Sequence, residues 1–301
     1  MATTATRPRS AALICNTKSR RGQALFEEAG RRLRAAGVDL TREAGVKEAA
    51  DVPREVERSV QSGVPLIVVG GGDGTLAGVS KSFIGRASVL GVLPLGTGNS
   101  FARSVGIPLE LPAAIDIVLN GLPGSVDLGL VNGVHFVNMA SIGLSAEVAK
   151  ETPHLLKRLT GPLAYLLTGA SRTMSHAPYT CTLITPERRI ECETHQCIIL
   201  NGSVFGTTEM DPAASAQDGV FHVYIMRGAS RAQIGKMWTA FLAGKPNEPP
   251  DAEIFTASSV RIETTPAQKI DVDGEILAET PADFAIVPRA LRMMLPASAG
   301  A

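Results

Sequence analysis

The sequence predicts two domains: an N-terminal α/β domain built on a parallel sheet, and a C-terminal antiparallel β-sandwich with inserted helices. The chain has 301 residues, of which 45% are hydrophobic, so it can bury two cores. Up to residue 124, short apolar runs alternate with helical patterns, which is typical of parallel strands joined by helices. From residue 125 to about 283, strand-like segments follow one another closely, which is typical of antiparallel sheets.

Glycine and proline mark the ends of the N-terminal elements. Strands are predicted at residues 11–15, 38–41, 66–69 and 89–93. Helices are predicted at residues 23–36, 53–61, 76–84, 100–106 and 111–119. Gly37, Gly63 and Gly85 can each end a helix, and Pro53 suits the first position of one. Because the strands are parallel, the loops that leave them are expected at one edge of the sheet.

The C-terminal elements are mostly strands. Asn132-Gly133 is a strong type I′ turn signal, so residues 125–131 and 135–139 are predicted to pair as a hairpin. The other predicted elements are strands at 179–184, 189–193, 196–200, 220–226, 253–257, 260–263 and 268–272, helices at 163–175 and 231–243, and a linker at 245–250. The segments 282–287 and 291–295 are apolar again.

Composition narrows the class of protein. The 29 basic residues balance 29 acidic ones, which argues against nucleic acid as the main partner. The four cysteines include no Cys-x-x-Cys pair, and we interpret them as reduced packing residues of a cytoplasmic protein. No run of about eighteen apolar residues is present, so any contact with a membrane is expected to be peripheral.

Two glycine-rich segments carry the first functional signal. Gly70 to Thr75 and Gly96 to Asn99 each follow a predicted strand and precede a helix. Their glycines permit positive φ and close approach of another molecule, while a helix N-terminus offers free amides to a phosphate. Neither the Walker A pattern nor the Gly-x-Gly-x-x-Gly fingerprint is present. For the first segment alone, an ordinary tight turn is the alternative.

Together the two segments resemble the diacylglycerol kinase catalytic-domain family, in particular its soluble bacterial lipid kinases. The resemblance rests on Gly71-Gly72-Asp73-Gly74-Thr75-Leu76 followed by Pro94-Leu95-Gly96-Thr97-Gly98-Asn99-Ser100-Phe101-Ala102-Arg103, and it covers nearly the whole chain. It implies an ATP-binding domain, a lipid-acceptor domain, a site in the cleft between them, and a return of residues from about 284 to 301 to the first domain. The residues that it implies for nucleotide binding are Asn16, Thr17, Lys18, Gly71, Gly72, Asp73, Gly74, Thr75, Gly96, Thr97, Gly98 and Asn99.

The chain departs from the family pattern at three places. Relatives usually have Asn-Pro-x-Ser-Gly after the first strand, where this chain has Thr17 and Arg20 instead of the proline and glycine. They commonly have Asn-Glu where this chain has Ala77-Gly78, and an aspartate where it has Ser100. For the first of these loops a solvated turn is therefore the alternative to nucleotide contact.

Three carboxylates lie within five residues, at Asp271, Asp273 and Glu275. Their repulsion would raise the pKa of the least solvated one, which suits a general base for a hydroxyl group. An exposed acidic turn is the alternative. By resemblance, Asp273-Gly274-Glu275 matches the Asp-Gly-Glu of the family, whose glutamate accepts the proton, so Glu275 is implied to be the catalytic base.

Asp73 and Asp218 complete the set of predicted catalytic residues. Asp73 stands between glycines, where it can reach a ligand or a metal-bound water; the alternative is a helix cap, a role open to Thr75 as well. Asp218-Gly219 resembles a segment that belongs to a magnesium-centred network in bacterial relatives, whose other ligands map to Ser215 and the Val220 carbonyl. A plain hairpin turn is the alternative. The five histidines show no metal-ligand spacing and are assigned no role.

The expected activity is transfer of the γ-phosphate of ATP, with Mg2+, to a lipid hydroxyl by a cytoplasmic enzyme that binds membranes peripherally. Residues 154–159 mix apolar and basic side chains and could touch an anionic bilayer, with an ordinary helix as the alternative. Two other functions stay open: a kinase for a soluble acceptor, like NAD kinase, and a nucleotide-binding regulator without catalysis. The acceptor is left open among diacylglycerol, phosphatidylglycerol, a sphingoid base and a polyprenol, and so is a homodimer.

Overall fold

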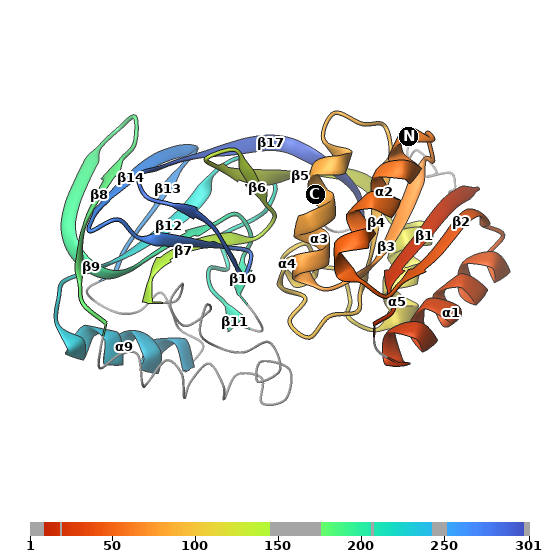
Figure 1. Cartoon of the computed structure of the whole chain (residues 1–301), viewed down its shortest axis with the longest axis horizontal. Helices are drawn as coiled ribbons and strands as arrows, with labels where there is room; N and C mark the ends of the chain where they lie inside the picture. Colours follow the sequence, from red (N-terminus) through yellow and green to blue (C-terminus); the bar gives the residue numbers. More distant parts are fainter. Residues whose placement is uncertain (1–8, 19, 145–175, 206–207, 243–251, 298–301) are drawn as a thin grey trace. The chain divides into compact units, whose positions relative to one another are not determined.

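The computed structural model describes residues 9–18, 20–144, 176–205, 208–242 and 252–297 (Figure 1). It consists of two compact units. The first contains residues 1–127 and 288–301, and the second contains residues 128–287. The chain passes between the units twice, in β5 (Leu122–Val131) and in β17 (Ala282–Leu295). The last residues of β17 therefore belong to the first unit.

The first unit is built on a parallel sheet in the order β2-β1-β3-β4-β17. Its own strands are β1 (Ser10–Asn16), β2 (Asp39–Val46), β3 (Leu66–Gly71) and β4 (Val89–Pro94). Each neighbouring pair is parallel, including β4 and β17, where Leu90 pairs with Met293. β3 is buried along its whole length, as a central parallel strand should be. The predicted parallel sheet is confirmed, and the loops that follow β1, β3 and β4 leave the same edge.

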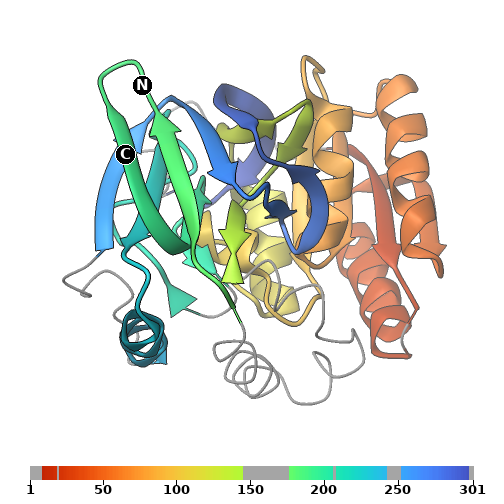
Figure 2. The same cartoon turned by 60° about the vertical axis from the view of Figure 1, so that its left-hand side comes forward.

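Helices cover both faces of this sheet, which lies between them (Figure 2). The helices are α1 (Arg20–Ala35), α2 (Val52–Gln61), α3 (Asp73–Ser80), α4 (Ser100–Ser104) and α5 (Leu111–Asn120). α1 packs beside α5 and α2 packs beside α3. α3 ends earlier than the predicted helix over 76–84, and a 3-10 turn over Lys81–Phe83 follows it. Phe83 is nevertheless buried, so the apolar stripe is real although the last turn is tighter.

A buried aspartate joins the two crossing strands within the first unit. Asp127 on β5 is 2% exposed, and its Oδ1 accepts a hydrogen bond from the Arg289 amide on β17 at 2.7 Å. Arg289 has a φ of +52°, in the left-handed region that costs a non-glycine residue roughly 1–2 kcal/mol. The bond to a charged acceptor offsets part of that cost and fixes the backbone where β17 enters the first unit.

The second unit is an antiparallel β-sandwich, which confirms the predicted change of fold after the first domain. Its strands are β6 (Val134–Phe136), β7 (Met139–Gly143), β8 (Tyr179–Ile184), β9 (Arg189–Leu200), β12 (Phe221–Arg227), β13 (Ala252–Ala257), β14 (Ser259–Thr265), β15 (Lys269–Val272), β16 (Glu275–Glu279) and the start of β17. A small separate sheet contains β10 (Val204–Phe205) and β11 (Thr208–Glu209), and helix α9 (Arg231–Leu242) follows β12. β9 pairs with β8 through residues 189–194 and with β7 through residues 196–200, so it connects the two halves of the sandwich.

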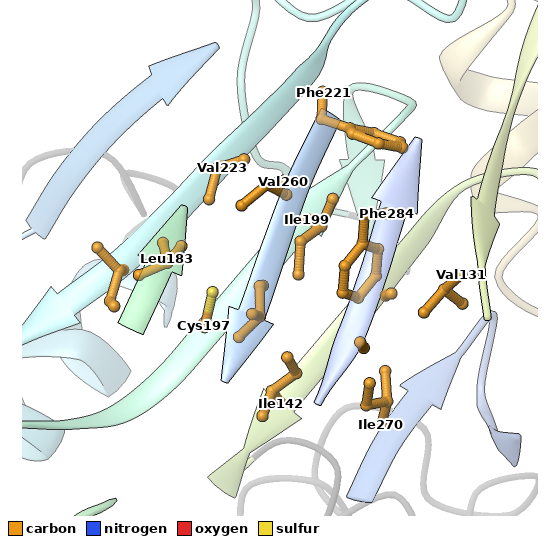
Figure 3. Packing of buried hydrophobic residues seen from close by; sticks show 14 of the residues in the cluster. Val131, Ile142, Leu183, Cys197, Ile199, Phe221, Val223, Val260, Ile270 and Phe284 are labelled. Carbon is orange, nitrogen blue, oxygen red and sulfur yellow. The ribbon is translucent and has the colours of Figure 1, made fainter. Parts of the chain in front are cut away.

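Aliphatic and aromatic side chains pack together in the core of the second unit (Figure 3). The rings of Phe136 and Phe221 stack with their centroids 5.7 Å apart, and Phe284 meets each of them edge-on at 6.5 Å. Such pairs add about 0.5–1.5 kcal/mol each to the stabilisation from burial. Cys181 and Cys197 are free thiols buried in the same core.

Three details of the predicted strands are wrong. In the hairpin, β6 ends at Phe136, and Met139 begins another strand. The segments 189–193 and 196–200 form one strand, because the polar Thr194 between them is buried and its hydroxyl donates to the Met226 carbonyl at 2.6 Å. The strands β10, β11 and β16 are absent from the prediction.

Several predictions fall outside the described residues. They are the helix over 163–175, the basic segment 154–159 and the linker over 245–250. Among the residues that the structure does describe, no helix has the length and apolar character needed to cross a membrane.

Candidate active site

The two glycine-rich loops follow neighbouring strands and pack against each other. The Leu95 amide donates to the Gly71 carbonyl at 2.9 Å. A Cβ on Gly96 would lie 2.5 Å from the Cα of Gly72, so even an alanine there would force the loops apart. None of the glycines at 70, 71, 72, 74 and 96 has a positive φ, so the left-handed conformation that glycine permits is not used. Gly70, Gly71, Gly72 and Gly96 are needed for close contact instead, whereas a Cβ on Gly74 would meet no atom within 4 Å.

Polar side chains fix the shape of the second loop. Asn99 is 4% exposed and has a φ of +52°. Its Oδ1 accepts from the Gly96 amide and its Nδ2 donates to the Gly96 carbonyl, both at 2.9 Å. Arg103 Nε donates to the Gly98 carbonyl at 3.1 Å. The structure thus gives Asn99, a predicted nucleotide-binding residue, a positioning role inside its own loop, while Thr97 beside it is exposed.

Asp73 connects the first loop to the second. Its Oδ1 accepts a hydrogen bond from the Phe101 amide, at the start of α4, at 2.9 Å. Capping of α3 by Asp73 or Thr75, the alternative to a ligand role for Asp73, does not occur, because the N-cap is Gly72 and no side chain caps the helix. The other carboxylate oxygen of Asp73 has no partner within the described residues. Asp73 therefore positions the second loop and keeps one oxygen available to a ligand.

The start of α3 is open. The amides of Thr75 and Leu76 donate to the Gly72 carbonyl at 3.0 and 3.1 Å, whereas the amides of Asp73 and Gly74, the first two of the helix, cannot bond within it. Gly74 is exposed, and a Cβ on it would meet no atom within 4 Å. Free amides at a helix N-terminus beside an exposed glycine are the groups that bind a phosphate.

The loop after β1 reaches the same edge of the sheet. Asn16 Oδ1 accepts from the Lys18 amide at 3.1 Å, and the Thr17 amide donates to the Val46 carbonyl at 2.7 Å. Thr17 is buried, and its hydroxyl has no hydrogen-bond partner in the described structure. Lys18 is exposed and lies 4.0 Å from Glu48. Asn16 and Thr17 thus have defined positions, while Lys18 behaves as the solvated alternative describes.

The three carboxylates of the acidic turn make different contacts. Asp271 Oδ1 accepts from the Gly274 amide at 2.8 Å, which closes the turn. The carboxylate of Asp273 accepts three backbone amides at 2.7, 3.0 and 3.1 Å, from Val137, Asn138 and Met139. Glu275 begins β16, is exposed, and has no bonded partner among the described side chains. Hydrogen bonds, rather than the expected repulsion, therefore organise the turn and leave Glu275 as the one free carboxylate of the three.

Asp218 is held by the loop that precedes β12. Its Oδ2 accepts from the Ser215 amide at 2.9 Å, and its Oδ1 accepts from the Val220 amide at 3.0 Å. The Ser215 hydroxyl in turn accepts from the Gln217 amide at 3.2 Å. The structure thus brings Asp218 together with the amides of Ser215 and Val220, whereas the predicted ligand atom of Val220 is its carbonyl oxygen.

Sequence reasoning misses the residues that contact Asp218 from the neighbouring strand. His222 Nε2 lies 3.2 Å from Asp218 Oδ2, and its Nδ1 lies 2.7 Å from Asp211 Oδ2. The Tyr224 hydroxyl donates to the same Asp211 oxygen at 2.7 Å. His222 and Tyr224 are two residues apart on β12 and so share one face of it. That spacing is the only local signal, because Asp211 comes from the far end of the loop.

Comparison with known proteins relates both units to lipid kinases. A family model described as the diacylglycerol kinase catalytic domain matches residues 10–131, and one described as the YegS C-terminal NAD kinase beta sandwich-like domain matches residues 138–295. A Pseudomonas aeruginosa (strain PAO1) protein named as a probable YegS-like lipid kinase is 36% identical over 289 residues, covering 94% of this chain and 91% of its own. The chain belongs to the diacylglycerol kinase family of lipid kinases.

A second relative of this kinase belongs to the same family. The diacylglycerol kinase of Staphylococcus epidermidis (strain RP62A) is 29% identical, covering 88% of this chain and 84% of its own. A crystal structure of a diacylglycerol kinase from Bacillus anthracis str. Sterne, 21% identical, superposes with a TM-score of 0.75 over 98% of this chain and 99% of its own. Another structure from that organism, 24% identical, gives 0.83 over the same shares. These two structures support the fold.

The His222 cluster of the kinase shifts three pKa values. Hydrogen bonding to Asp218 raises the pKa of His222; burial opposes this and Asp211 adds to it. Burial alone would raise the pKa of Asp218, but hydrogen bonds from His222 and from two backbone amides outweigh it and lower that pKa. Burial is likewise outweighed at Asp211, where bonds from Tyr224, a backbone amide and His222 lower the pKa. The imidazolium and both carboxylates therefore stabilise one another.

We expect His222→Gln to remove a pH-dependent part of the kinase's stability. A raised folded pKa contributes stability that is complete below the ordinary histidine value of 6.5 and is lost as pH rises through the folded value. The lowered pKa values of the two aspartates contribute stability that is complete above their ordinary value of 3.8 and is lost as pH falls through their folded values. The wild-type Tm should exceed the variant Tm most between these limits, and the difference should shrink on both sides. His135→Gln is the control, and a difference independent of pH would contradict the assignment.

Hydrogen bonds already occupy part of the Asp218 carboxylate. A carboxylate offers about four acceptor positions, and three at Asp218 already receive donors from Ser215, Val220 and His222. Across the described residues, no group of three or more His, Cys, Asp or Glu side chains is arranged to hold a metal ion. The metal site predicted at Asp218, Ser215 and the Val220 carbonyl stays a prediction, with about one acceptor position of Asp218 left for a ligand.

Asp273→Ala should destabilise the kinase by roughly 2–4 kcal/mol, because it removes a charged acceptor from three amides of buried residues. Urea unfolding measures the effect. Asp283→Ala is the control, since Asp283 is an exposed partner of Arg261 and its loss should leave the free energy of unfolding nearly unchanged. Equal effects of the two substitutions would show that the amides of residues 137–139 do not depend on Asp273.

Proposed function

We propose that this kinase transfers the γ-phosphate of ATP to the hydroxyl group of a membrane lipid, with diacylglycerol as the first candidate. The observation that carries the proposal is the open start of α3, where the amides of Asp73 and Gly74 have no partner within the helix and the two glycine-rich loops pack against each other. Phosphate binding at such a site needs only backbone groups. Support for a lipid acceptor comes from relatives named diacylglycerol kinase and lipid kinase.

Each residue has one task in the proposed reaction. The amides at Asp73 and Gly74 bind the phosphates, while Asn99 and Arg103 keep the second loop in shape. The other oxygen of Asp73 is the group that would hold Mg2+, which when bound would neutralise charge on the phosphates. Glu275 accepts the proton of the lipid hydroxyl as that oxygen attacks the γ-phosphorus and the β-γ bond breaks.

The test is incubation of the purified kinase with labelled ATP, Mg2+ and vesicles that contain one candidate lipid each. Diacylglycerol, phosphatidylglycerol, a sphingoid base and a polyprenol are the four arms. We expect label in one lipid only. Because the proposed enzyme is cytoplasmic and binds membranes peripherally, the labelled product should lie at the vesicle surface. Absence of label in every lipid, with nucleotide binding intact, would refute the proposal.

A kinase for a soluble acceptor is the second candidate. It is favoured by the match of residues 138–295 to a sandwich described as NAD kinase-like, since a related acceptor domain could receive a related acceptor. A parallel incubation with NAD and with soluble sugars, without vesicles, distinguishes the two. Nucleotide binding without transfer to any acceptor would instead indicate a regulator.

A further inference from the structure

Leu277 has the largest exposed fraction of any large apolar side chain in the described part of the chain. It is 49% exposed, against 43% for Leu122 and 38% for Ile254. A single exposed leucine is common on protein surfaces and by itself indicates no function. Leu277, however, lies two residues from Glu275, the proposed catalytic base, on the strand β16. Its position therefore relates it to the proposed site.

A bulge in β16 leaves Leu277 without a partner in the sheet. Ile276 pairs with Asp271 on β15, and Ala278 pairs with Ile270. Leu277, the residue between them on β16, has no counterpart on β15. β16 is also an edge strand, since among the described strands it pairs only with β15. Bulges at sheet edges and beside active sites redirect a side chain, so the local structure of β16 accounts for the exposure of Leu277.

The backbone on both sides of Leu277 is fixed. Ile276 and Ala278 are half-buried, and Ala278 packs against the core of the second unit. The exposed residues of β16 are Glu275, Leu277 and Glu279. Because a strand advances about 3.3 Å per residue, the backbones of Glu275 and Leu277 are roughly 6–7 Å apart. One ligand can therefore reach the carboxylate and the apolar side chain together.

The chemistry of the acceptor determines what would lie beside Leu277. When the acceptor hydroxyl is within hydrogen-bond reach of Glu275, the atoms next to that hydroxyl lie near Leu277. In a diacylglycerol, a sphingoid base or a polyprenol, hydrocarbon begins close to the hydroxyl, and its burial against a leucine is favourable. In phosphatidylglycerol a phosphodiester separates the free hydroxyls from the acyl chains, and a sugar carries further hydroxyls there. Burial of such polar groups against an apolar side chain is unfavourable.

We propose that Leu277 contacts the hydrocarbon adjacent to the acceptor hydroxyl and so selects a lipid whose chain begins beside that group. The inference rests on the proposed function, because Glu275 defines where the hydroxyl lies, and it deepens that function by naming the class of acceptor. Phosphatidylglycerol, sugars and NAD fall outside the class. Leu277 takes no part in proton or phosphoryl transfer, so its substitution should change the KM for the lipid and not kcat.

The first test compares Leu277→Ser with the wild-type kinase on diacylglycerol in phosphatidylcholine vesicles. Loss of the contact made by a half-exposed leucine should raise the KM for diacylglycerol by about 4- to 12-fold, with kcat and the KM for ATP unchanged. Leu277→Met, which keeps an apolar side chain of similar volume, should retain a KM close to that of the wild type. Leu122→Ser, which replaces an exposed leucine of the first unit, is the control and should not change the KM. An unaltered KM in Leu277→Ser, or transfer to phosphatidylglycerol in preference to diacylglycerol, would overturn the proposal.

The second test measures binding without nucleotide and without transfer. The wild-type protein should co-sediment with phosphatidylcholine vesicles more strongly when they contain diacylglycerol. Leu277→Ser should weaken this diacylglycerol-dependent binding, whereas Leu122→Ser should preserve it. Equal binding by Leu277→Ser and the wild type would overturn the proposal. Binding that follows the expected pattern without phosphorylation of any lipid would instead refute the proposed function and leave the contact standing, so the two failures are distinct.

Discussion

Glu275→Gln is expected to reduce phosphoryl transfer by a factor of about 10²–10⁴, the usual contribution of a general base, while leaving the Tm unchanged. Glu275 is exposed and has no bonded partner among the described side chains, so the amide replaces the carboxylate at no cost in contacts. Its two acidic neighbours in the turn already accept backbone amides and cannot take its place without breaking the turn. Initial rates with saturating ATP and vesicle-bound lipid measure the effect.

The same strand offers a matched control for this substitution. Glu279, the last residue of β16, is also exposed, so Glu279→Gln changes the same net charge on the same strand. It should retain the wild-type rate. If both variants lost activity equally, the loss would reflect charge on β16 in general, and if Glu275→Gln kept its full rate, the base would have to be another residue.

The parallel sheet can be predicted from the sequence because its strands are buried on both faces. Strands such as β3 are then continuous apolar runs, and glycine or proline marks where the chain leaves them. The edges are harder to predict. β16 reads Glu-Ile-Leu-Ala-Glu and is exposed at alternate residues, and nothing in five such residues distinguishes an edge strand from a helical turn.

The glycine loops can be located from sequence, but the reason for each glycine cannot. Gly72 and Gly96 lie far apart in the sequence, and only the fold shows that their backbones touch. Asp73 likewise reads as a cap or a ligand, because its contact with the Phe101 amide depends on how two loops meet. Tertiary contacts of this kind have no local pattern.

His222 shows the same limit for the candidate site. Five scattered histidines carry no spacing signal, and the significance of this one depends on Asp211, which the chain brings back to it across a loop. A sequence reader can find the aspartate that resembles a metal ligand. Only the structure shows that a ring on the next strand contacts it.

Gly74→Ala is expected to weaken ATP binding by about 10- to 100-fold while slightly stabilising the fold. The protein itself does not require a glycine there, because φ is not positive and a Cβ would meet no atom within 4 Å. Alanine should therefore stabilise the first turn of α3 by up to about 1 kcal/mol. A methyl group beside the free amides would collide with a bound phosphate, and overpacking of this size costs about 1–3 kcal/mol. Nucleotide titration and thermal unfolding measure the two effects separately.

Gly78→Ala on the same helix is the control that distinguishes an effect on the bound nucleotide from an effect on the stability of the helix. A Cβ on Gly78 would make ordinary contact with Pro53 at 3.6 Å, and alanine is favoured in a helix interior by about 1 kcal/mol. Both variants should gain stability, but only Gly74→Ala should lose nucleotide affinity. Because the two changes are chemically identical and four residues apart, unaltered affinity in Gly74→Ala would mean that phosphate does not approach α3, and the nucleotide site would have to lie elsewhere on the sheet edge.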